Sequence, residues 1–188
     1  MVKSKLDNDS ILVSNVLNGD TDSFSLLVSK YRDGIFNFIY KMTFSREDAE
    51  DILQEVFIRV YNNLYKYDNR WHFSTWLYRI ALNVFKSHYV KKKKQRNIDY
   101  QEVLSTLTGN LINDPELVYE IKERNLEILK ILDSLKFEDK TILVLKHIQG
   151  FSYREISEIL KLSPENVRIK VMRAKKVLYK KFTEHREV

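Results

Sequence analysis

The sequence predicts an all-α protein made of two small helical domains joined by a flexible linker. Its 188 residues include only four glycines and two prolines, which favours long helices over sheets with many tight turns. Apolar residues recur at spacings of three and four in both halves of the chain, as on the buried face of a helix. The stretch 96–114 is polar and lacks this periodicity. We therefore predict an N-terminal domain at 1–95, a linker at 96–114 and a C-terminal domain at 115–188.

The first two helices are predicted at residues 10–17 and 21–42. The pair Asn18-Gly19 ends the first helix, because glycine readily adopts the conformation that stops one. The second helix carries apolar residues at helical spacing from Phe24 to Ile39. Gly34 interrupts it at a cost in helix stability, which indicates close packing against a neighbour.

Two further helices complete the first half. Ser45 and Asp48 have the spacing of a capping box, which predicts a helix with a buried face from Ala49 to Leu64. After a loop at 67–73, Ser74 is expected to cap a fourth helix that runs into the basic cluster at 91–96.

The second half is expected to begin at Asp114-Pro115, an N-cap followed by proline in the first helical position. A helix follows at 138–148 and ends at Gly150, a position that suits a left-handed C-terminal stop.

Two closely spaced helix starts come next. Ser152 with Glu155 forms a capping box, and Ser163 precedes Pro164 as an N-cap before a proline. Only residues 161–163 lie between the two predicted helices, so the helices must cross steeply. This is the geometry of a helix-turn-helix, which reads duplex DNA with its second helix.

The second helix of this motif separates its residues by face. A stripe at spacings of three and four is predicted to be buried: Val167, Val171, Ala174, Leu178 and Phe182. Polar and basic residues lie off this stripe: Asn166, Arg168, Lys170, Arg173, Lys175 and Lys176. Arginine and lysine donate to guanine edges or phosphates, and asparagine pairs with adenine. An ordinary solvated basic face is the alternative, but the paired caps and the short turn favour DNA binding.

Composition narrows the function further. The formal net charge is +6 and is concentrated in clusters at 91–96 and 161–181, which indicates a polyanionic partner, nucleic acid before membrane. The absence of cysteine excludes disulfides and thiolate metal sites and fits the cytoplasm. No apolar run suits a membrane span, and the N-terminus lacks a signal-peptide core. The four dispersed histidines show no ligand spacing and no catalytic motif is present, so we expect no metal, no cofactor and no enzymatic activity.

The first half has three unusual surface features. A polar stripe with three acidic residues shares one side of the third helix: Asp48, Asp51, Gln54, Glu55 and Ile58. Aromatic residues flank the following loop: Tyr65, Tyr67, Trp71, Phe73, Trp76 and Tyr78. Cationic and polar residues follow at 79–94. A solvated face, core aromatics and a solvated helix end would explain each feature separately. Together, aromatics beside cations are how proteins hold unstacked single-stranded bases.

Four motifs occur in a fixed order along the chain: residues 48–57 (DAEDILQEVF), 73–81 (FSTWLYRIA), 150–156 (GFSYREI) and 167–174 (VRIKVMRA). In these motifs the chain resembles the extracytoplasmic-function sigma factors of bacteria, over residues 24–182. The resemblance implies a protein that binds core RNA polymerase, directs it to promoters and helps to melt DNA.

The resemblance also implies roles for particular residues. One set would dock on the clamp helices of the largest polymerase subunit: Asp48, Asp51, Gln54, Glu55 and Phe57. A second set would capture and melt the −10 element: Asp68, Asn69, Arg70, Trp71, His72, Phe73, Ser74, Arg79, Asn83 and Lys86. A third set would read the −35 element: Lys146, Asn166, Arg168, Ile169, Lys170, Met172 and Arg173.

Two departures from the family pattern concern the third set. Glu165-Asn166 replaces a common glycine-threonine, and Ile169-Lys170 replaces a common serine-arginine. These changes preserve the docking mode and leave the −35 sequence open. The resemblance further implies an anti-sigma partner, soluble or membrane-anchored. Two other readings remain: a repressor or activator whose first half dimerises or senses, and an RNA- or single-strand-binding protein, which would leave the duplex reader unexplained.

Overall fold

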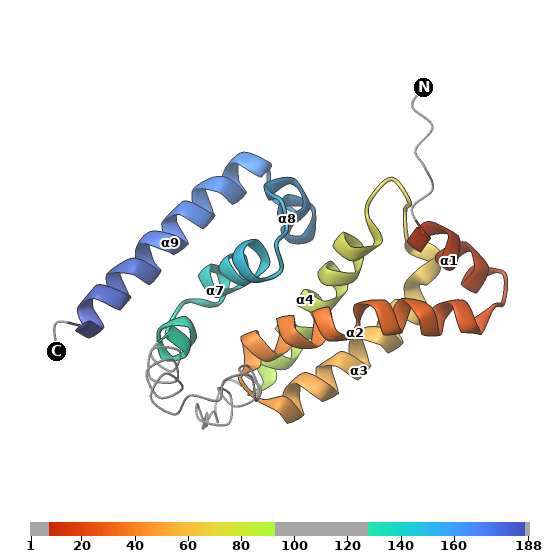
Figure 1. The fold of residues 1–188 in the computed structure, drawn as a ribbon, viewed down its shortest axis with the longest axis horizontal. Helices are drawn as coiled ribbons and strands as arrows, with labels where there is room; N and C mark the ends of the chain where they lie inside the picture. The colour runs from red at the N-terminus through yellow and green to blue at the C-terminus, as the bar shows by residue number, and fades with distance from the viewer. Residues whose placement is uncertain (1–7, 93–127, 187–188) are drawn as a thin grey trace, which may run out of the picture.

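The computed structural model describes residues 8–92 and 128–186, and every regular element within those ranges is helical. The first half contains α1 (Asn8–Leu17), α2 (Thr21–Thr43), α3 (Arg46–Asn63), the 3₁₀ turn η1 (Leu64–Lys66) and α4 (Phe73–Lys92). The second half contains α7 (Phe137–Leu143), the π-helical segment η2 (Val144–Ile148), α8 (Tyr153–Leu160) and α9 (Pro164–Arg186), after a helical segment at 128–133. The prediction of an all-α fold is confirmed (Figure 1). The predicted linker and the Asp114-Pro115 start lie outside the described residues.

The ends of the first three helices follow from local chemistry. Gly19 has a φ of +98° and closes α1, as its sequence position predicts. Asp20 caps α2 by accepting hydrogen bonds from the amides of Asp22 (3.0 Å) and Ser23 (3.3 Å). Ser45 caps α3 by accepting from the amide of Asp48 at 3.2 Å. These three predicted boundaries are therefore correct to within one or two residues.

The start of α4 differs from the prediction. The helix begins at Phe73, and the carbonyl of His72 accepts from the amides of Thr75 (3.0 Å) and Trp76 (3.3 Å). Ser74 therefore lies inside the first turn and is not the cap. The backbone of His72 starts the helical hydrogen-bond pattern without a serine hydroxyl.

The segment predicted as one α-helix at 138–148 also differs from the prediction, because its hydrogen bonding changes from α-helical to π-helical. The α-helical part ends at Leu143, and η2 continues with π-type bonds such as that from the Gln149 amide to the Val144 carbonyl (3.0 Å). Gly150, at a φ of +76°, then ends the segment as predicted.

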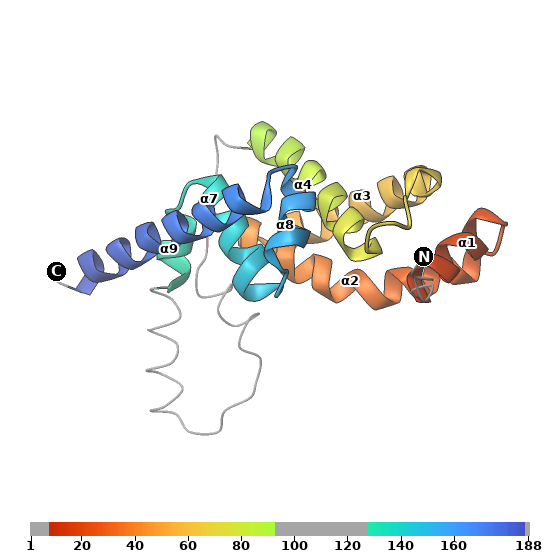
Figure 2. The same cartoon turned by 90° about the horizontal axis from the view of Figure 1, so that it is seen from above.

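The two halves share one continuous hydrophobic core. The ring of Phe137 on α7 stacks on that of Phe85 on α4, with centroids 5.7 Å apart. The ring of Phe151 meets that of Tyr78 edge to face at 4.7 Å. Figure 2 shows α7 and α8 against α2 and α4, with α1 and α9 at opposite ends of the molecule. The described parts of the predicted domains are thus packed directly against each other.

Tyr78 is central to this packing. Burial raises the pKa of its hydroxyl, which stays protonated and donates to Oε1 of Gln149 at 2.7 Å, across the two halves. A Cβ atom at Gly34 would lie 3.1 Å from the same hydroxyl oxygen. The close packing predicted at Gly34 is therefore confirmed, and Tyr78 is the neighbour that requires it.

A buried lysine, which sequence analysis missed, also joins the halves. Lys140 on α7 is 4% exposed. Its Nζ donates to the Met42 carbonyl at the end of α2 (3.2 Å) and to Oδ1 of Asp133 (3.0 Å), and lies 3.9 Å from the centroid of the Phe44 ring. A cation at the C-terminal end of a helix is stabilised by the helix dipole.

We expect Lys140→Met to lower the free energy of unfolding by about 2 kcal/mol. Methionine fills the same space but leaves Asp133 and the Met42 carbonyl without the ammonium group. Urea denaturation measures the loss, with the exposed Lys136→Met as control, for which a change within about 0.5 kcal/mol is expected. Equal stability of the two variants would show that the buried ammonium contributes nothing.

No helix in residues 8–92 or 128–186 combines the length and the apolar character that a bilayer crossing needs.

Candidate nucleic-acid interface

The helix-turn-helix forms as predicted. Ser152 and Glu155 make both bonds of the capping box: the Ser152 amide donates to the Glu155 carboxylate (2.8 Å), and the Glu155 amide donates to the Ser152 hydroxyl (3.2 Å). Lys161, at a φ of 55°, turns the chain after α8. The Ser163 hydroxyl accepts from the Asn166 amide at 3.2 Å and starts α9.

One face of α9 is buried and the opposite face is exposed to solvent. Val167, Val171 and Ala174 are at most 2% exposed, which confirms the centre of the predicted stripe. Leu178 and Phe182 are only partly buried. Five of the predicted −35 residues are exposed: Asn166, Arg168, Ile169, Met172 and Arg173. We call these five the α9 outer face.

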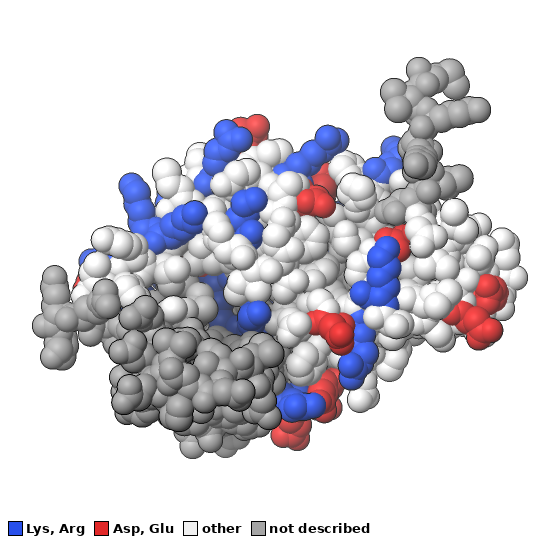
Figure 3. Space-filling view, in the orientation of Figure 1, with Lys and Arg blue, Asp and Glu red and all other residues white. Residues whose placement is uncertain are grey.

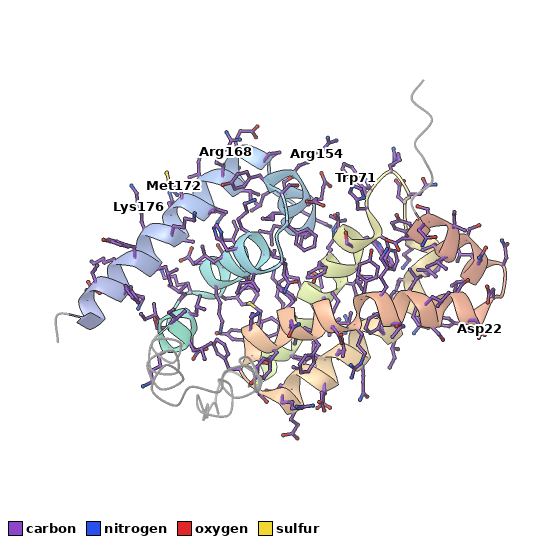
Figure 4. The ribbon with its side chains drawn as sticks, viewed as in Figure 1. Asp22, Trp71, Arg154, Arg168, Met172 and Lys176 are labelled. Atoms are coloured by element: carbon purple, nitrogen blue, oxygen red, sulfur yellow. The ribbon has the colours of Figure 1, made fainter. Side chains whose placement is uncertain are left out.

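The α9 outer face points away from the rest of the protein. In Figure 4 the side chains of Arg168, Met172 and Lys176 project from the same edge of α9, and that of Arg154 projects from α8. Figure 3 shows lysine and arginine side chains gathered over this helix. Such a face provides hydrogen-bond donors for base edges and positive charge for phosphates.

Two predicted −35 residues lie elsewhere. Lys170 points toward α7, where its Nζ is 3.1 Å from a carboxylate oxygen of Glu138. Lys146, on η2, donates to the Phe151 carbonyl at 3.1 Å and has its Nζ 4.7 Å from the centroid of the Tyr153 ring. The guanidinium of Arg168 lies 5.5 Å from the same ring centroid. The side chain of Tyr153 thus lies within reach of two cations of the predicted set.

The loop between η1 and α4 carries exposed aromatic and polar groups. The Tyr67 hydroxyl donates to the Trp71 carbonyl at 2.7 Å and holds the loop closed. Asp68 accepts from the Arg70 amide and guanidinium, both at 3.0 Å, and the guanidinium holds the pKa of that carboxyl below its ordinary value. Asn69, Trp71 and His72 are exposed.

Phe73 is a correction to the predicted −10 set. Its side chain is 1% exposed, and its ring packs against those of Tyr31, Tyr67 and Trp76 at centroid distances of 5.5, 5.4 and 5.7 Å. A ring so enclosed cannot contact DNA without unfolding the loop. Phe73 instead anchors the loop that presents its exposed neighbours, and Ser74 beside it is partly buried.

The α4 residues of the −10 set face two directions. Asn83 and Lys86 are exposed. Arg79 faces α8, with a terminal nitrogen 3.9 Å from a Glu158 carboxylate oxygen, and its buried Nε has no hydrogen-bond partner. Lys86 and Lys170 both line a pocket of about 150 Å³ between the two halves. Lys86, predicted to contact the −10 element, and Lys170, predicted to contact the −35 element, therefore line the same pocket between the two halves.

The polar stripe of α3 lies mainly at the surface. Asp51 and Gln54 are exposed, whereas Asp48 and Phe57 are partly buried. Glu55 bonds His88 Nε2 on α4 at 2.5 Å and also pairs with Arg59; the bond to His88 holds the pKa of Glu55 below its ordinary value. The same line continues through the exposed Ile58 and Tyr61, and Tyr61 was missed by sequence analysis.

No three histidine, aspartate or glutamate side chains converge as a metal site among residues 8–92 and 128–186. The surfaces described above offer hydrogen bonds, stacking and charge, and these suit a macromolecular partner.

Comparison with family models matches both halves of the chain. Residues 27–95 match Sigma-70 region 2, and residues 125–178 match Sigma-70, region 4. The sequence is 34% identical over 181 residues to the ECF RNA polymerase sigma factor SigW of Bacillus subtilis, covering 92% of this chain and 95% of that one. It is 29% identical to the ECF RNA polymerase sigma-E factor of Escherichia coli, with coverages of 90% and 92%.

Two solved structures have the same fold. The structure of CnrH in complex with the cytosolic domain of CnrY matches with a TM-score of 0.70 at 22% identity, over 92% of this chain and 96% of that one. The sigma factor RpoE of Bartonella quintana, solved with the anti-sigma factor NepR, matches with a TM-score of 0.62 at 17% identity, over 85% and 96%.

Proposed function

The chain belongs to the extracytoplasmic-function family of RNA polymerase sigma factors, and on this premise we propose how its surfaces divide the work of transcription initiation. It is a transcription initiation factor that binds core polymerase and directs it to promoters. We assign it to the cytoplasm and give it no catalytic role of its own. The main support for separate −10 and −35 contacts is that two chemically different surfaces are exposed, one on α9 and one on the loop before α4.

The exposed part of the α3 stripe is the proposed polymerase contact. Asp51 and Gln54 are exposed on one side of the helix, with Asp48 and Phe57 partly exposed beside them. Glu55 contributes from a fixed position, because His88 and Arg59 restrain its carboxylate. The proposed partner is the pair of clamp helices of the largest polymerase subunit.

The −10 element is assigned to the loop at 68–72 with Ser74 and to the exposed side of α4. An exposed indole at Trp71 can stack on an unpaired base, and the amide of Asn83 can bond a base edge. The exposed Lys86 supplies positive charge for the melted strand, and Arg79 joins it once its contact with Glu158 is released. Phe73 is no longer part of the contacting set, because its ring is buried.

The −35 element is assigned to the α9 outer face together with Lys146. Arg168 and Arg173 are exposed and carry the fork of donors that matches the O6 and N7 atoms of guanine. Ile169 and Met172 provide apolar contact for thymine methyl groups. Lys170 joins this set once its ion pair with Glu138 is released.

The proposed domains are 1–95 and 115–188, with 96–114 as the tether that lets them change their relative position. Both halves match sigma-factor regions, so the alternatives of a repressor and of an RNA-binding protein find no support. We also propose that an anti-sigma protein regulates the chain, as in the solved complexes of CnrH with CnrY and RpoE with NepR.

Reconstituted transcription tests the proposed function. Core polymerase is incubated with the full chain and a pool of genomic promoter fragments, and the 5′ ends of the transcripts are sequenced. Discrete start sites that require the added chain, with shared upstream sequences, are expected. Start sites identical to those of core polymerase alone would contradict the proposal.

Single substitutions separate the two DNA surfaces. Arg173→Ala should weaken use of the −35 element by about 5- to 150-fold, because a direct guanine contact is worth roughly 1–3 kcal/mol. The loss should persist on a template whose −10 region is held open by mismatches. Asn83→Ala should alter base preference in the −10 element and leave duplex binding upstream unchanged. Abortive transcription on templates with single-base changes measures both effects, and exchanged phenotypes would refute the assignment.

A further inference from the structure

Tyr153 lies beside two members of the proposed −35 set, Lys146 and Arg168, but has no assigned role. It occupies the first position of α8, directly after the N-cap Ser152. The two capping-box bonds between Ser152 and Glu155 fix the backbone there, and the ring packs partly against the hydrophobic core. The capping bonds and the core contacts therefore hold the ring in place.

Two cations from different elements lie over this ring. The Nζ atom of Lys146 is 4.7 Å from the ring centroid, and the guanidinium carbon of Arg168 is 5.5 Å from it. Both distances are within about 6 Å, the range in which a cation is attracted to the electron-rich face of an aromatic ring. Lys146 comes from η2 and Arg168 from the start of α9, so the ring joins the two helical units that flank α8.

The two cations are restrained to different degrees. Lys146 also donates to the Phe151 carbonyl at 3.1 Å. Arg168 is exposed and forms no ion pair within the described part of the chain. The structure shows its guanidinium in contact with the Tyr153 ring. A flexible arginine loses rotamer entropy when it is fixed against a base, so a side chain that is already ordered binds more tightly.

We propose that Tyr153 is a positioning residue for −35 recognition, which holds Arg168 and Lys146 in place for duplex DNA through its aromatic face. This inference rests on the proposed role of α9. The ring acts through the two cations, and its hydroxyl is not required. Tyr153→Phe keeps the ring, whereas Tyr153→Leu keeps apolar bulk and loses the cation attraction.

The test uses the full chain bound to core polymerase, on templates with each single-base change in the −35 element. Tyr153→Leu should lower use of the preferred −35 element about 5- to 10-fold and flatten the preference at the base that Arg168 reads. Tyr153→Phe should restore both. In an Arg168→Ala background, Tyr153→Leu should add less than about twofold, because residues that act through one another are not additive. Circular dichroism confirms that each variant is folded.

The outcomes distinguish this inference from the function on which it depends. If Arg168→Ala leaves the base preference unchanged, the assignment of α9 is wrong, and the inference falls with it. If Arg168→Ala acts but Tyr153→Phe is as defective as Tyr153→Leu, the hydroxyl contacts DNA directly and the positioning role is overturned. A full additional loss from Tyr153→Leu in the Arg168→Ala background would overturn it as well.

Discussion

A reducible cross-link between α4 and α8 should abolish promoter-directed transcription until it is cleaved. The two proposed DNA surfaces belong to halves that pack together through one core. Elements named −10 and −35 lie about 25 base pairs apart, which is about 85 Å along the duplex. A compact chain of 188 residues has a radius of gyration of only about 16 Å. We therefore expect that the packed arrangement does not engage both elements at once and that the halves separate on the promoter.

The experiment introduces a cysteine pair, Arg79→Cys with Glu158→Cys, at the contact between α4 and α8. The contact joins the tips of two long side chains, so the two thiols are joined by a bifunctional maleimide reagent that contains a reducible disulfide. The chain has no cysteine of its own, so only the introduced pair reacts. The cross-linked protein should lose at least tenfold in full-length transcription. A reductant that cleaves the cross-link should restore transcription to the level of the same variant carrying the cleaved reagent. That comparison removes the effect of losing Arg79 itself.

Two controls make the result specific. Each single-cysteine variant, treated with the same cross-linking reagent, should show no such loss. The cross-linked double variant should still bind a short duplex that contains only the −35 element, because the α9 outer face stays exposed in the packed arrangement. Full transcription by completely cross-linked protein would mean that the halves need not separate.

Asp51→Lys should weaken binding to core polymerase by roughly 100-fold, while leaving the fold intact. The side chain is exposed on α3, so the change should alter the free energy of unfolding by no more than about 0.5 kcal/mol. Reversing a charge within an interface places it against a partner of the same sign, and truncating one partner of a buried charge pair already costs about 2–5 kcal/mol. Titration with fluorescently labelled chain measures the affinity, and circular dichroism checks the helix content.

Asp33→Lys is the matched control for net charge. Asp33 lies on α2, and its side chain is 88% exposed. The same change of two charge units there should leave polymerase affinity within about twofold of the original chain, since it lies off the α3 stripe. Equal losses from both variants would indicate a general effect of charge, and normal affinity of Asp51→Lys would refute the assignment of α3.

Sequence-based prediction succeeded where structure depends on neighbours within one helical turn. Ser152 with Glu155, and Ser163 with Pro164, located both helices of the DNA-reading motif, because a cap bonds amides two or three residues away. The buried stripe of α9 was readable for the same reason, since a helical period fixes which residues share a face. Ser74 failed as a cap because a backbone carbonyl, here that of His72, can begin a helix without it.

Sequence analysis predicted which residues belong to the candidate site, but not how those residues are arranged in space. Asp51, Trp71, Asn83 and Arg168 are exposed, as contacts with polymerase or DNA require. Phe73 was placed on the surface because an aromatic residue in a loop gives no local sign of what will cover it. Tyr153 was overlooked because its two cations lie at sequence separations of 7 and 15 residues.

The amino-acid sequence by itself determined the all-α class, the caps at Ser45, Ser152 and Ser163, the DNA-reading motif and the family of the protein. Only the tertiary structure decided that Lys140 is buried against the end of α2, that Arg79 faces Glu158, and that Lys86 and Lys170 line one pocket. The physical reason is the sequence separation over which each kind of interaction acts. Capping bonds and helical periodicity act within a few residues of the chain, whereas the contact from Lys140 to Met42 spans 98 residues and exists only once the two halves have packed.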